Sequence, residues 1–534
     1  MINKDELKSK MSEKLSEGKD NFRENTLIGK DKEEKENIIK NRYHAVERKA
    51  FGAFIGWLLK KIRNSDDKRE FYLKALDKIS WFYKEEDYQH LLKRVRDAIN
   101  DPNHRWVNFI SEIIDETDPN VLKTFFLNVG YEVFLRGMST VRKNREKYNC
   151  NIPYVVLFDP TNACNMHCEG CWSGTYGKKD NLSYEIMDKI VTQSKELGTH
   201  MFMMTGGEPM VRRKDVFKLA EKHYDCEFVL YTNSTFINDE VCQKCVELGN
   251  IAFMVSIEGT PETNDQRRGD GHYETVMNAM DLLKRYGIIF GTSVCYTKYN
   301  IDAVTSDEFF ELISSKGARL GFFFHYMPVG ANAVLDLLPT PEQRKYMYER
   351  IRYIRSPECN IKFFPMDFQN DGEFIGGCIA GGREYFHINA AGYAEPCVFI
   401  HYSDANIHDH SILEILQSPL FMAYRQGQPF NDNHLRPCPM LENPQMLKDL
   451  VHRTNAIDTN NESSEGVDDL CDKCKDYADA WKPVADEIWE SHDHWYSAYK
   501  DTNKVHVVYG EEELKKDAVS KAEVSKKVAK ADKE

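Results

Sequence analysis

Between residues 153 and 327, the sequence alternates short runs rich in β-forming residues with stretches of helical periodicity. The six runs are PYVVLFD (153–159), HMFMMT (200–205), EFVLYT (227–232), IAFMVSI (251–257), GIIFGTSVCYT (287–297) and ARLGFFFHYM (318–327). Helices are expected between them, near residues 183–197, 213–223, 239–248, 273–286 and 303–316. Strands that alternate with helices build a parallel sheet covered by helices. Because six units fall short of a closed eight-stranded barrel, we predict an α/β domain with an open, partial (β/α)6 barrel.

Polar and glycine-rich segments follow four of these strands directly. CNMHCEGC (164–171) comes after the first strand, GGEP (206–209) after the second and TNST (232–235) after the third, while Ser256 and Glu258 end the fourth. In parallel α/β folds the functional site lies at the carboxyl ends of the strands. The sequence therefore predicts one pocket shared by these segments.

The segment CNMHCEGC holds three cysteines with the spacing CxxxCxxC: Cys164, Cys168 and Cys171. The N-terminus, MINKDELKSK, has no apolar signal region, so we expect a cytoplasmic protein whose thiols stay reduced and whose clustered cysteines bind metal. An iron–sulfur cube normally takes four thiolates, so three would leave one iron open. Taken alone, the spacing also permits zinc, or a three-thiolate site completed by a distant residue.

The combination of CxxxCxxC after the first strand, GGEP after the second and six βα units resembles the radical S-adenosylmethionine (SAM) superfamily, over about residues 150–330. The resemblance implies that the three cysteines bind three irons of a [4Fe–4S] cluster, and that SAM chelates the fourth iron. One electron through the cluster would then cleave SAM to methionine and a 5′-deoxyadenosyl radical, which abstracts hydrogen from the substrate. In such enzymes the cofactors carry the chemistry and the protein positions them.

The same resemblance gives roles to the other strand-end residues. It implies that Gly206 and Gly207 meet the SAM amino group, with Glu208 and Pro209 fixing that turn. Glycine lacks a Cβ, which lets backbone approach a ligand closely. Ser256 and Glu258 are two apart on a strand, hence on one face, from which they would reach the SAM ribose.

Further residues are expected around this pocket. Asn233 would lie just behind it, and MPVG (327–330) would lie along the adenine. Arg267 and Arg268 either pair with the SAM carboxylate or are ordinary surface arginines. The family usually has an aromatic residue before the third cysteine, where this chain has Gly170, and Trp172 stands one place after it. A Gly-Cys ending also occurs in the adenosylhopene-forming branch, which acts on a lipid.

A second set of cysteines follows the barrel. Cys378, Gly392 and Cys397 form a Cx13Gx4C pattern that resembles the first half of a SPASM/Twitch extension, which binds auxiliary iron–sulfur clusters. Within it, HINAAGYAEPC (387–397) is expected to form a strand, a turn and a second strand. The compact CxxCx5CxxxC block of a full SPASM domain is missing. We therefore expect one auxiliary [4Fe–4S] cluster on Cys378, Cys397 and Cys438, with Cys474 as fourth ligand and Cys471 as its competitor; zinc is the alternative. Cys295 is expected to be a packing thiol.

The remaining sequence suggests further domains around this core. We expect a mobile charged N-terminus (1–40), a helical domain (41–148), the radical SAM core (149–330), a helical linker (331–357), a SPASM/Twitch-like auxiliary cluster domain (358–500) and a disordered polar tail (501–534). Within the helical domain, Phe51, Phe54, Ile55, Leu58 and Ile62 form one apolar stripe, followed by basic residues. The stripe either packs on the next domain, which we favour, or makes peripheral contact with a membrane.

The sequence thus predicts a radical SAM enzyme with an unidentified substrate: a peptide, a lipid or another small molecule. Such an enzyme needs an external electron donor such as ferredoxin or flavodoxin. The net charge of −14 and the lack of a basic stripe argue against nucleic acid, and no apolar run is long enough to span a bilayer. The alternative is a non-catalytic iron–sulfur electron carrier or redox sensor, which would not need GGEP, Ser256 or Glu258.

Overall fold

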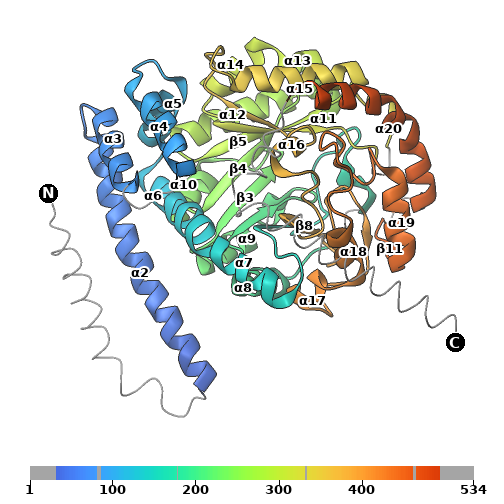
Figure 1. Cartoon of the computed structure of the whole chain (residues 1–534), viewed down its shortest axis with the longest axis horizontal. Coiled ribbons are helices and arrows are strands. Elements are labelled where there is room, and N and C mark those ends of the chain that lie inside the picture. Colours follow the sequence, from blue (N-terminus) through green and yellow to red (C-terminus); the bar gives the residue numbers. More distant parts are fainter. Residues whose placement is uncertain (1–31, 81–85, 177–178, 331–332, 461–464, 493–534) are drawn as a thin grey trace.

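The computed structural model describes residues 32–80, 86–176, 179–330, 333–460 and 465–492 (Figure 1). Most of the expected mobile N-terminus and all of the expected polar tail lie outside these ranges. Residues 32–40, which we assigned to the mobile N-terminus, instead form the beginning of helix α2. No helix among the described residues is long and apolar enough to cross a membrane.

A nine-stranded sheet forms the centre of the molecule, in the order β7-β6-β5-β4-β3-β2-β1-β8-β9. All neighbouring strands are parallel except β8 and β9. The strands are β1 (Val155–Phe158), β2 (Met201–Met204), β3 (Glu227–Thr232), β4 (Ile251–Ser256), β5 (Phe290–Tyr296), β6 (Leu320–His325), β7 (Phe364–Asp367), β8 (Tyr385–Ile388) and β9 (Ala394–Glu395). The α/β class is confirmed, and the open sheet is consistent with a partial barrel.

Helices follow the strands near the residues that the sequence predicts, and the short helix over residues 261–268 is one that was not predicted. They are α8 (Tyr184–Leu197), α9 (Arg213–Lys222), α10 (Asp239–Leu248), α11 (Pro261–Arg268), α12 (His272–Arg285), α13 (Ile301–Thr305), α14 (Asp307–Ser315) and α15 (Pro341–Arg355). The single helix expected at 303–316 is two helices. Ser306 has extended backbone and its side chain accepts a hydrogen bond from the Phe309 N–H, so it ends α13 and caps α14.

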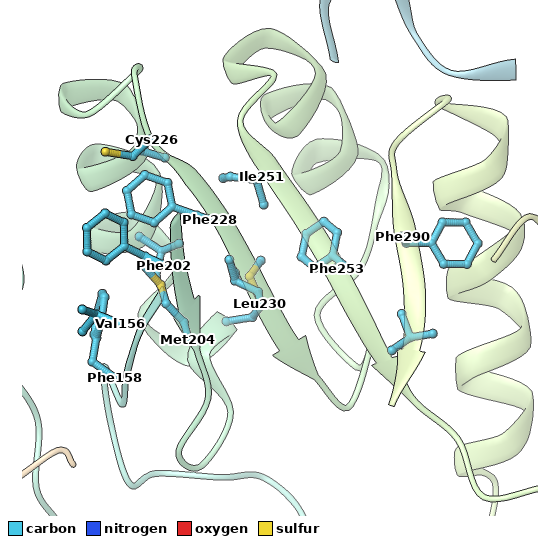
Figure 2. Packing of buried hydrophobic residues seen from close by; sticks show 14 of the residues in the cluster. Val156, Phe158, Phe202, Met204, Cys226, Phe228, Leu230, Ile251, Phe253 and Phe290 are labelled. Atoms are coloured by element: carbon cyan, nitrogen blue, oxygen red, sulfur yellow. The ribbon is translucent and has the colours of Figure 1, made fainter. Parts of the chain in front are cut away.

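Alternate residues of each strand point to the two faces of the sheet. One face packs against the helices in a continuous core that includes Phe158, Phe202, Phe228 and Phe253 (Figure 2). The Phe202 and Phe228 rings stack with their centroids 5.7 Å apart. Side chains alternate along a strand. The residues between these, such as Leu157, Met203 and Tyr231, therefore point to the opposite face of the sheet and line a cavity there.

The C-terminal part of the sheet was only partly predicted. The strand–turn–strand expected at 387–397 is present as the antiparallel pair β8 and β9. The sequence did not predict β7, which pairs with β6, or the pairing of β8 with β1, which runs from Val155↔Tyr385 to Phe158↔Ile388. The segment that carries the second cysteine set therefore continues the barrel sheet directly. The run YFHI is short, and nothing in its own sequence says which strand it joins.

The N-terminal helices cover the amino ends of the barrel strands. They are α2 (Lys32–Arg63), α3 (Lys68–Ser80), α4 (Glu86–Asn100), α5 (Arg105–Glu116), α6 (Pro119–Phe125), the π-helix η1 (Phe126–Gly137) and α7 (Met138–Tyr148). The Asp118 N–H donates to the Gly287 carbonyl before β5, and the Asn128 amide donates to the Cys226 carbonyl before β3. This domain therefore lies at the end of the barrel opposite the predicted site.

The apolar stripe of α2 divides between two environments. Ile55 and Ile62 are buried with Leu122 of α6, as expected for packing on the next domain. Phe54 is 46% exposed, and its neighbour Trp57 is equally exposed. Packing therefore explains the aliphatic residues of the stripe, and an aromatic edge of the helix remains at the surface.

The C-terminal region packs beside β8 and β9. It contains α16 (Gly372–Ile375), β10 (Tyr402–Ser403), α17 (Ile412–Leu416), α18 (Pro419–Gly427), α19 (Pro444–Thr454), β11 (Ile457–Asp458) and α20 (Val467–Glu490). The apolar core of this region includes Cys471 and Cys474 of α20 and is flanked by Cys378, Cys397 and Cys438. The second cysteine set is thus gathered from four separate segments.

Candidate functional site

The three cysteines of the CxxxCxxC segment line one cavity of about 290 Å³ inside the sheet. Gly206, Gly207 and Glu208 line the same cavity. The Gly207 and Glu208 N–H groups donate to the carbonyls of Thr161 and Ala163, which joins the turn to the start of the cysteine segment. A Cβ at Gly207 would lie 2.3 Å from the Ala163 oxygen, so this close backbone contact requires glycine.

Burial controls the protonation of these thiols. It raises the pKa of Cys164 to about 11 and raises the pKa of Cys171 as well. A thiolate is the form that binds metal, so metal binding at this site must release protons.

Glu208 fixes the position of the Gly-Gly turn through the hydrogen bonds of its buried side chain. Its carboxylate accepts hydrogen bonds from the Asn233 N–H at 2.7 Å, the Met210 N–H at 3.0 Å and the Thr232 hydroxyl at 2.9 Å. Burial nevertheless outweighs these bonds and raises the pKa of Glu208 to about 7. Pro209 follows as the first residue of a short 3-10 helix and does not line the cavity. The Asn233 side chain lies between Asn165, at 2.9 Å, and Cys164 Sγ, at 3.8 Å.

Ser256 and Glu258 differ in what they contact. Ser256 ends β4 and lines the cavity, whereas Glu258 is fully buried and does not line it. Glu258 Oε1 instead lies 2.5 Å from Arg267 Nη1 and 2.5 Å from Arg268 Nη2. Its other oxygen, Oε2, accepts a hydrogen bond from the Cys295 N–H at 3.0 Å. Glu258 therefore faces the two arginines and the β5 backbone here, an arrangement that does not support its expected contact with the SAM ribose.

The two arginines themselves line the cavity, so they are not surface residues. Arg268 Nη1 lies 3.9 Å from Cys168 Sγ, and the Glu169 N–H donates to the Arg267 carbonyl. Glu258 thus holds a pair of guanidinium groups beside the cysteine segment, where they can bind a carboxylate. The sequence left this role open, because RRG by itself does not show whether the arginines are buried.

Gly170 has no room for a side chain because Tyr326 lies against it. Gly170 has a positive φ of 62°, and a Cβ there would lie 2.6 Å from Tyr326 Cε2. Tyr326 directly precedes the MPVG segment and lines the cavity. A Cβ at Gly330 would lie 2.6 Å from the Cys171 oxygen, so this segment packs on the cysteine segment. Tyr326 therefore supplies an aromatic wall where a side chain at position 170 would otherwise stand.

Trp172 connects the cysteine segment with the C-terminal region. Its ring lies edge-on to His387, with centroids 5.8 Å apart, and to Phe399, at 6.3 Å. His387 is fully buried between Asp159, at 3.0 Å, and Glu395, at 2.8 Å. Burial alone would lower the pKa of His387, but the two carboxylates raise it to about 10. The positively charged His387 side chain thus links the end of β1 to β9. β1 precedes Cys164 in the chain, and β9 precedes Cys397. No motif in the sequence indicates this contact.

The second cysteine set surrounds a smaller cavity of about 50 Å³, lined by Cys378, Cys397 and Cys438. Burial raises the pKa of Cys378 to about 11 and that of Cys397 to about 12. Cys474 and Cys471 lie close by on α20, both buried, and neither lines this cavity. Five residues line both cavities, so the two sites share a wall: Met327, Phe368, Ile379, Tyr385 and Phe399.

The donor sets fit clusters of several irons. Within the described residues, no three His, Cys, Asp or Glu side chains converge closely enough to hold a single metal ion. Each cysteine trio is instead spread around a cavity. Thiolates are the ligands of iron–sulfur clusters, so each trio supplies the donors that such a cluster needs.

Comparison with known proteins agrees with this geometry. Residues 158–310 match the model of the radical SAM superfamily, and residues 378–440 match the SPASM iron–sulfur cluster-binding domain. The AdoMet-dependent heme synthase of Oleidesulfovibrio alaskensis is 24% identical over 52% of this chain and 78% of its own length. The PqqA peptide cyclase of Rhizobium meliloti is 25% identical over 54% of this chain and 79% of its own length.

Among solved structures, Streptococcus suis SuiB bound to S-adenosylmethionine aligns over 56% of this chain and 76% of its own, with 17% identity and a TM-score of 0.47. The two family matches cover the segments that hold the two cysteine trios. The chain therefore carries a radical SAM domain over residues 158–310, followed by a SPASM iron–sulfur cluster-binding domain over residues 378–440.

Proposed function

We propose that this protein is a radical SAM enzyme that cleaves SAM at a [4Fe–4S] cluster held by Cys164, Cys168 and Cys171, and abstracts hydrogen from a substrate bound in the same cavity. One observation carries the proposal: the three thiols, the Gly-Gly turn and the arginine pair all line a single cavity. The substrate must reach this cavity too, because the reactive group forms there.

The family matches imply the cofactors. A radical SAM domain implies a SAM-binding [4Fe–4S] cluster and SAM, and a SPASM domain implies additional iron–sulfur clusters. When bound, the cluster supplies the electron that cleaves SAM reductively, so an external donor such as ferredoxin or flavodoxin is part of the proposal. The protein must bind, orient and shield these groups.

Different residues of the cavity are assigned to different parts of the cluster and of SAM. We assign the three thiolates to three irons, which leaves one iron for SAM. Gly206 and Gly207 bring backbone close to the SAM amino group, and Glu208 and Pro209 fix that turn. Arg267 and Arg268 bind the SAM carboxylate, and Glu258 holds them in place without touching SAM. Ser256 and Asn233 complete the polar side of the cavity.

The SPASM region holds the second cluster in this proposal. Cys378, Cys397 and Cys438 line its cavity, and Cys474 remains our choice for the fourth ligand, with Cys471 as its competitor. The cavity is enclosed by apolar side chains such as Tyr424 and Phe399. Burial of this kind limits the access of water to a cluster and tunes its potential.

A non-catalytic electron carrier or redox sensor is the second candidate. Such a protein needs clusters but no site for SAM. The arginine pair held beside Cys168 and the glycine turn beside Cys164 favour the enzyme, because neither is required for holding a cluster alone.

The test uses anaerobically reconstituted protein with SAM and dithionite. We expect release of 5′-deoxyadenosine from the wild-type protein. The triple variant Cys164→Ala, Cys168→Ala, Cys171→Ala should release none and hold about four fewer irons per chain. The matched control removes three buried thiols outside both cavities, with Cys150→Ala, Cys226→Ala and Cys242→Ala, and should keep both properties. A cysteine-segment variant that still cleaves SAM would refute the proposal.

A further inference from the structure

The same cavity is also lined by a group of aromatic side chains to which the proposed SAM site assigns no role. Phe324 of β6 is surrounded by other rings: Phe368 at 5.1 Å, Phe322 at 5.8 Å, Phe399 at 6.2 Å and Tyr231 at 6.3 Å between centroids. All five residues line the cavity. We call them the aromatic half. They come from the barrel strands, from the residue after β7 and from the SPASM region, so the fold assembles this surface from separate segments.

The charged residues that line the cavity already have partners. Arg267 and Arg268 contact Glu258 and are assigned to the SAM carboxylate, and Glu208 accepts three hydrogen bonds. Glu384 lies 3.7 Å from Arg145. Among the described lining residues there is no lysine, and a charged group on a substrate would therefore find no free counter-ion in the aromatic half.

Several polar atoms around the aromatic half are also engaged, and the Ser293 hydroxyl, on the strand beside Phe322, lines the same cavity. The Tyr231 hydroxyl points to Met203 Sδ at 3.9 Å, and the Tyr385 hydroxyl lies 2.7 Å from Cys397 Sγ. His325 contacts the Tyr326 carbonyl at 2.6 Å and the Tyr477 hydroxyl at 2.5 Å. A peptide backbone placed against the five rings would bury amide groups that the rings cannot pair, and each such group weakens binding because its hydrogen bonds to water are lost.

We propose that the aromatic half binds the hydrocarbon chain of a lipid and presents one of its C–H bonds to the SAM side of the cavity. The inference rests on the proposed function and names its substrate class. A hydrocarbon chain gains from burial against aromatic and methionine side chains and needs no polar partner. In the step itself, the C–H bond breaks homolytically, the hydrogen atom passes to the 5′-carbon derived from SAM, and the unpaired electron stays on the chain.

Two other substrate classes are outcomes of the test. The relatives named above include a heme synthase and a peptide cyclase. A tetrapyrrole that carries carboxylates would need free cations, and a peptide segment would need hydrogen-bond partners. The aromatic half offers neither among its described residues, which is why we commit to a lipid.

The experiment measures the transfer of deuterium from a labelled substrate to 5′-deoxyadenosine. Bacteria grown in perdeuterated medium supply three fractions: polar lipids in detergent, peptides, and extracted tetrapyrroles. Each fraction is incubated anaerobically with the reconstituted holoprotein, SAM and dithionite, and the 5′-deoxyadenosine formed is analysed by mass spectrometry. We expect deuterium in 5′-deoxyadenosine with the lipid fraction only.

A variant pair tests the surface itself. Phe324→Asp puts a carboxylate at the centre of the aromatic half and should lower deuterium transfer from lipid roughly ten-fold or more, because the charge must be buried without a partner. Phe324→Leu, which keeps the surface apolar, should retain most of the transfer. The matched control is Phe134→Asp, at a residue 59% exposed on η1, which should behave like the wild type. Iron content and circular dichroism show whether each variant is folded.

The outcomes separate this inference from the proposed function. Failure to form any 5′-deoxyadenosine contradicts the proposed function itself. Formation of 5′-deoxyadenosine that carries deuterium from peptides or tetrapyrroles, or from no fraction, overturns the lipid inference and leaves the enzyme class intact. Since the fraction experiment uses the wild-type protein, it decides the question even if Phe324→Asp does not fold.

Discussion

At the scale of single residues, Glu258 shows how a buried carboxylate can serve a site without entering it. Its side chain is fully buried against Arg267 and Arg268. We predict that Glu258→Gln lowers the free energy of unfolding by about 3–5 kcal/mol, because breaking a buried ion pair leaves charge uncompensated. It should also weaken SAM binding, measured by equilibrium dialysis. Ser256→Ala, at a residue that does line the cavity, should affect SAM binding alone. A stable Glu258→Gln protein with normal SAM affinity would contradict the assignment.

The close packing of Tyr326 on Gly170 leads to a second prediction for single residues. We expect Gly170→Ala to weaken SAM binding, because its Cβ collides with the Tyr326 ring. In a Tyr326→Leu background the same change should be milder, with a coupling of about 0.5–3 kcal/mol in a double-mutant cycle. The strain of the positive φ at position 170 is present in both backgrounds and cancels. Additive effects of the two substitutions would show that the ring does not occupy this space.

At the scale of elements, α2 presents buried and exposed residues side by side. We predict that Ile55→Ala lowers the free energy of unfolding by about 2–5 kcal/mol, because Ile55 packs in the core with Leu122. Phe54→Ala, one residue earlier and half exposed, should change it by no more than about 0.5 kcal/mol. Denaturant unfolding of the two variants measures the difference. Equal losses would mean that the exposed aromatic edge is covered in solution.

A buried carboxylate at the contact between η1 and β3 is expected to make the stability of the protein depend on pH. Glu227 is fully buried, and burial raises its pKa from 4.5 to about 8, although Asn128 donates to it. The folded state therefore holds this proton more tightly than the unfolded state, and stability should fall as pH rises from about 4.5 through about 8. Glu227→Gln removes this titration. Its melting temperature relative to the wild type should therefore rise across that same pH range, and a constant difference would argue against a buried, titrating carboxylate.

At the scale of the whole molecule, the SPASM region closes around a second cysteine site that borders the first. We predict about eight irons per chain after reconstitution, as two cubes of four. Cys474→Ala should lower this number toward about four, whereas Cys471→Ala, one turn away on α20, should not. Iron analysis and EPR of the reduced protein measure both. The reverse pattern would exchange the two assignments, and no effect of either would point to a ligand outside α20.

Many features of this molecule follow from local sequence. The six strands and the segments that follow them appear where the sequence predicts them, because hydrophobic period and motif spacing are properties of neighbouring residues. The resemblance of those motifs to the radical SAM superfamily was confirmed by the family matches. The radical SAM and SPASM domains could therefore be recognised from the sequence alone.

Contacts between distant segments were decided only by the tertiary structure. The pairing of β8 with β1 joins strands that lie far apart in the sequence, and no periodicity encodes it. Tyr326 fills the space beside Gly170, Glu258 turns to the arginines, and the N-terminal helices cover the amino ends of the strands. Each depends on which surfaces meet once the chain is packed. The sequence by itself determined the strands and the cofactor motifs, and packing decided which side chains surround them.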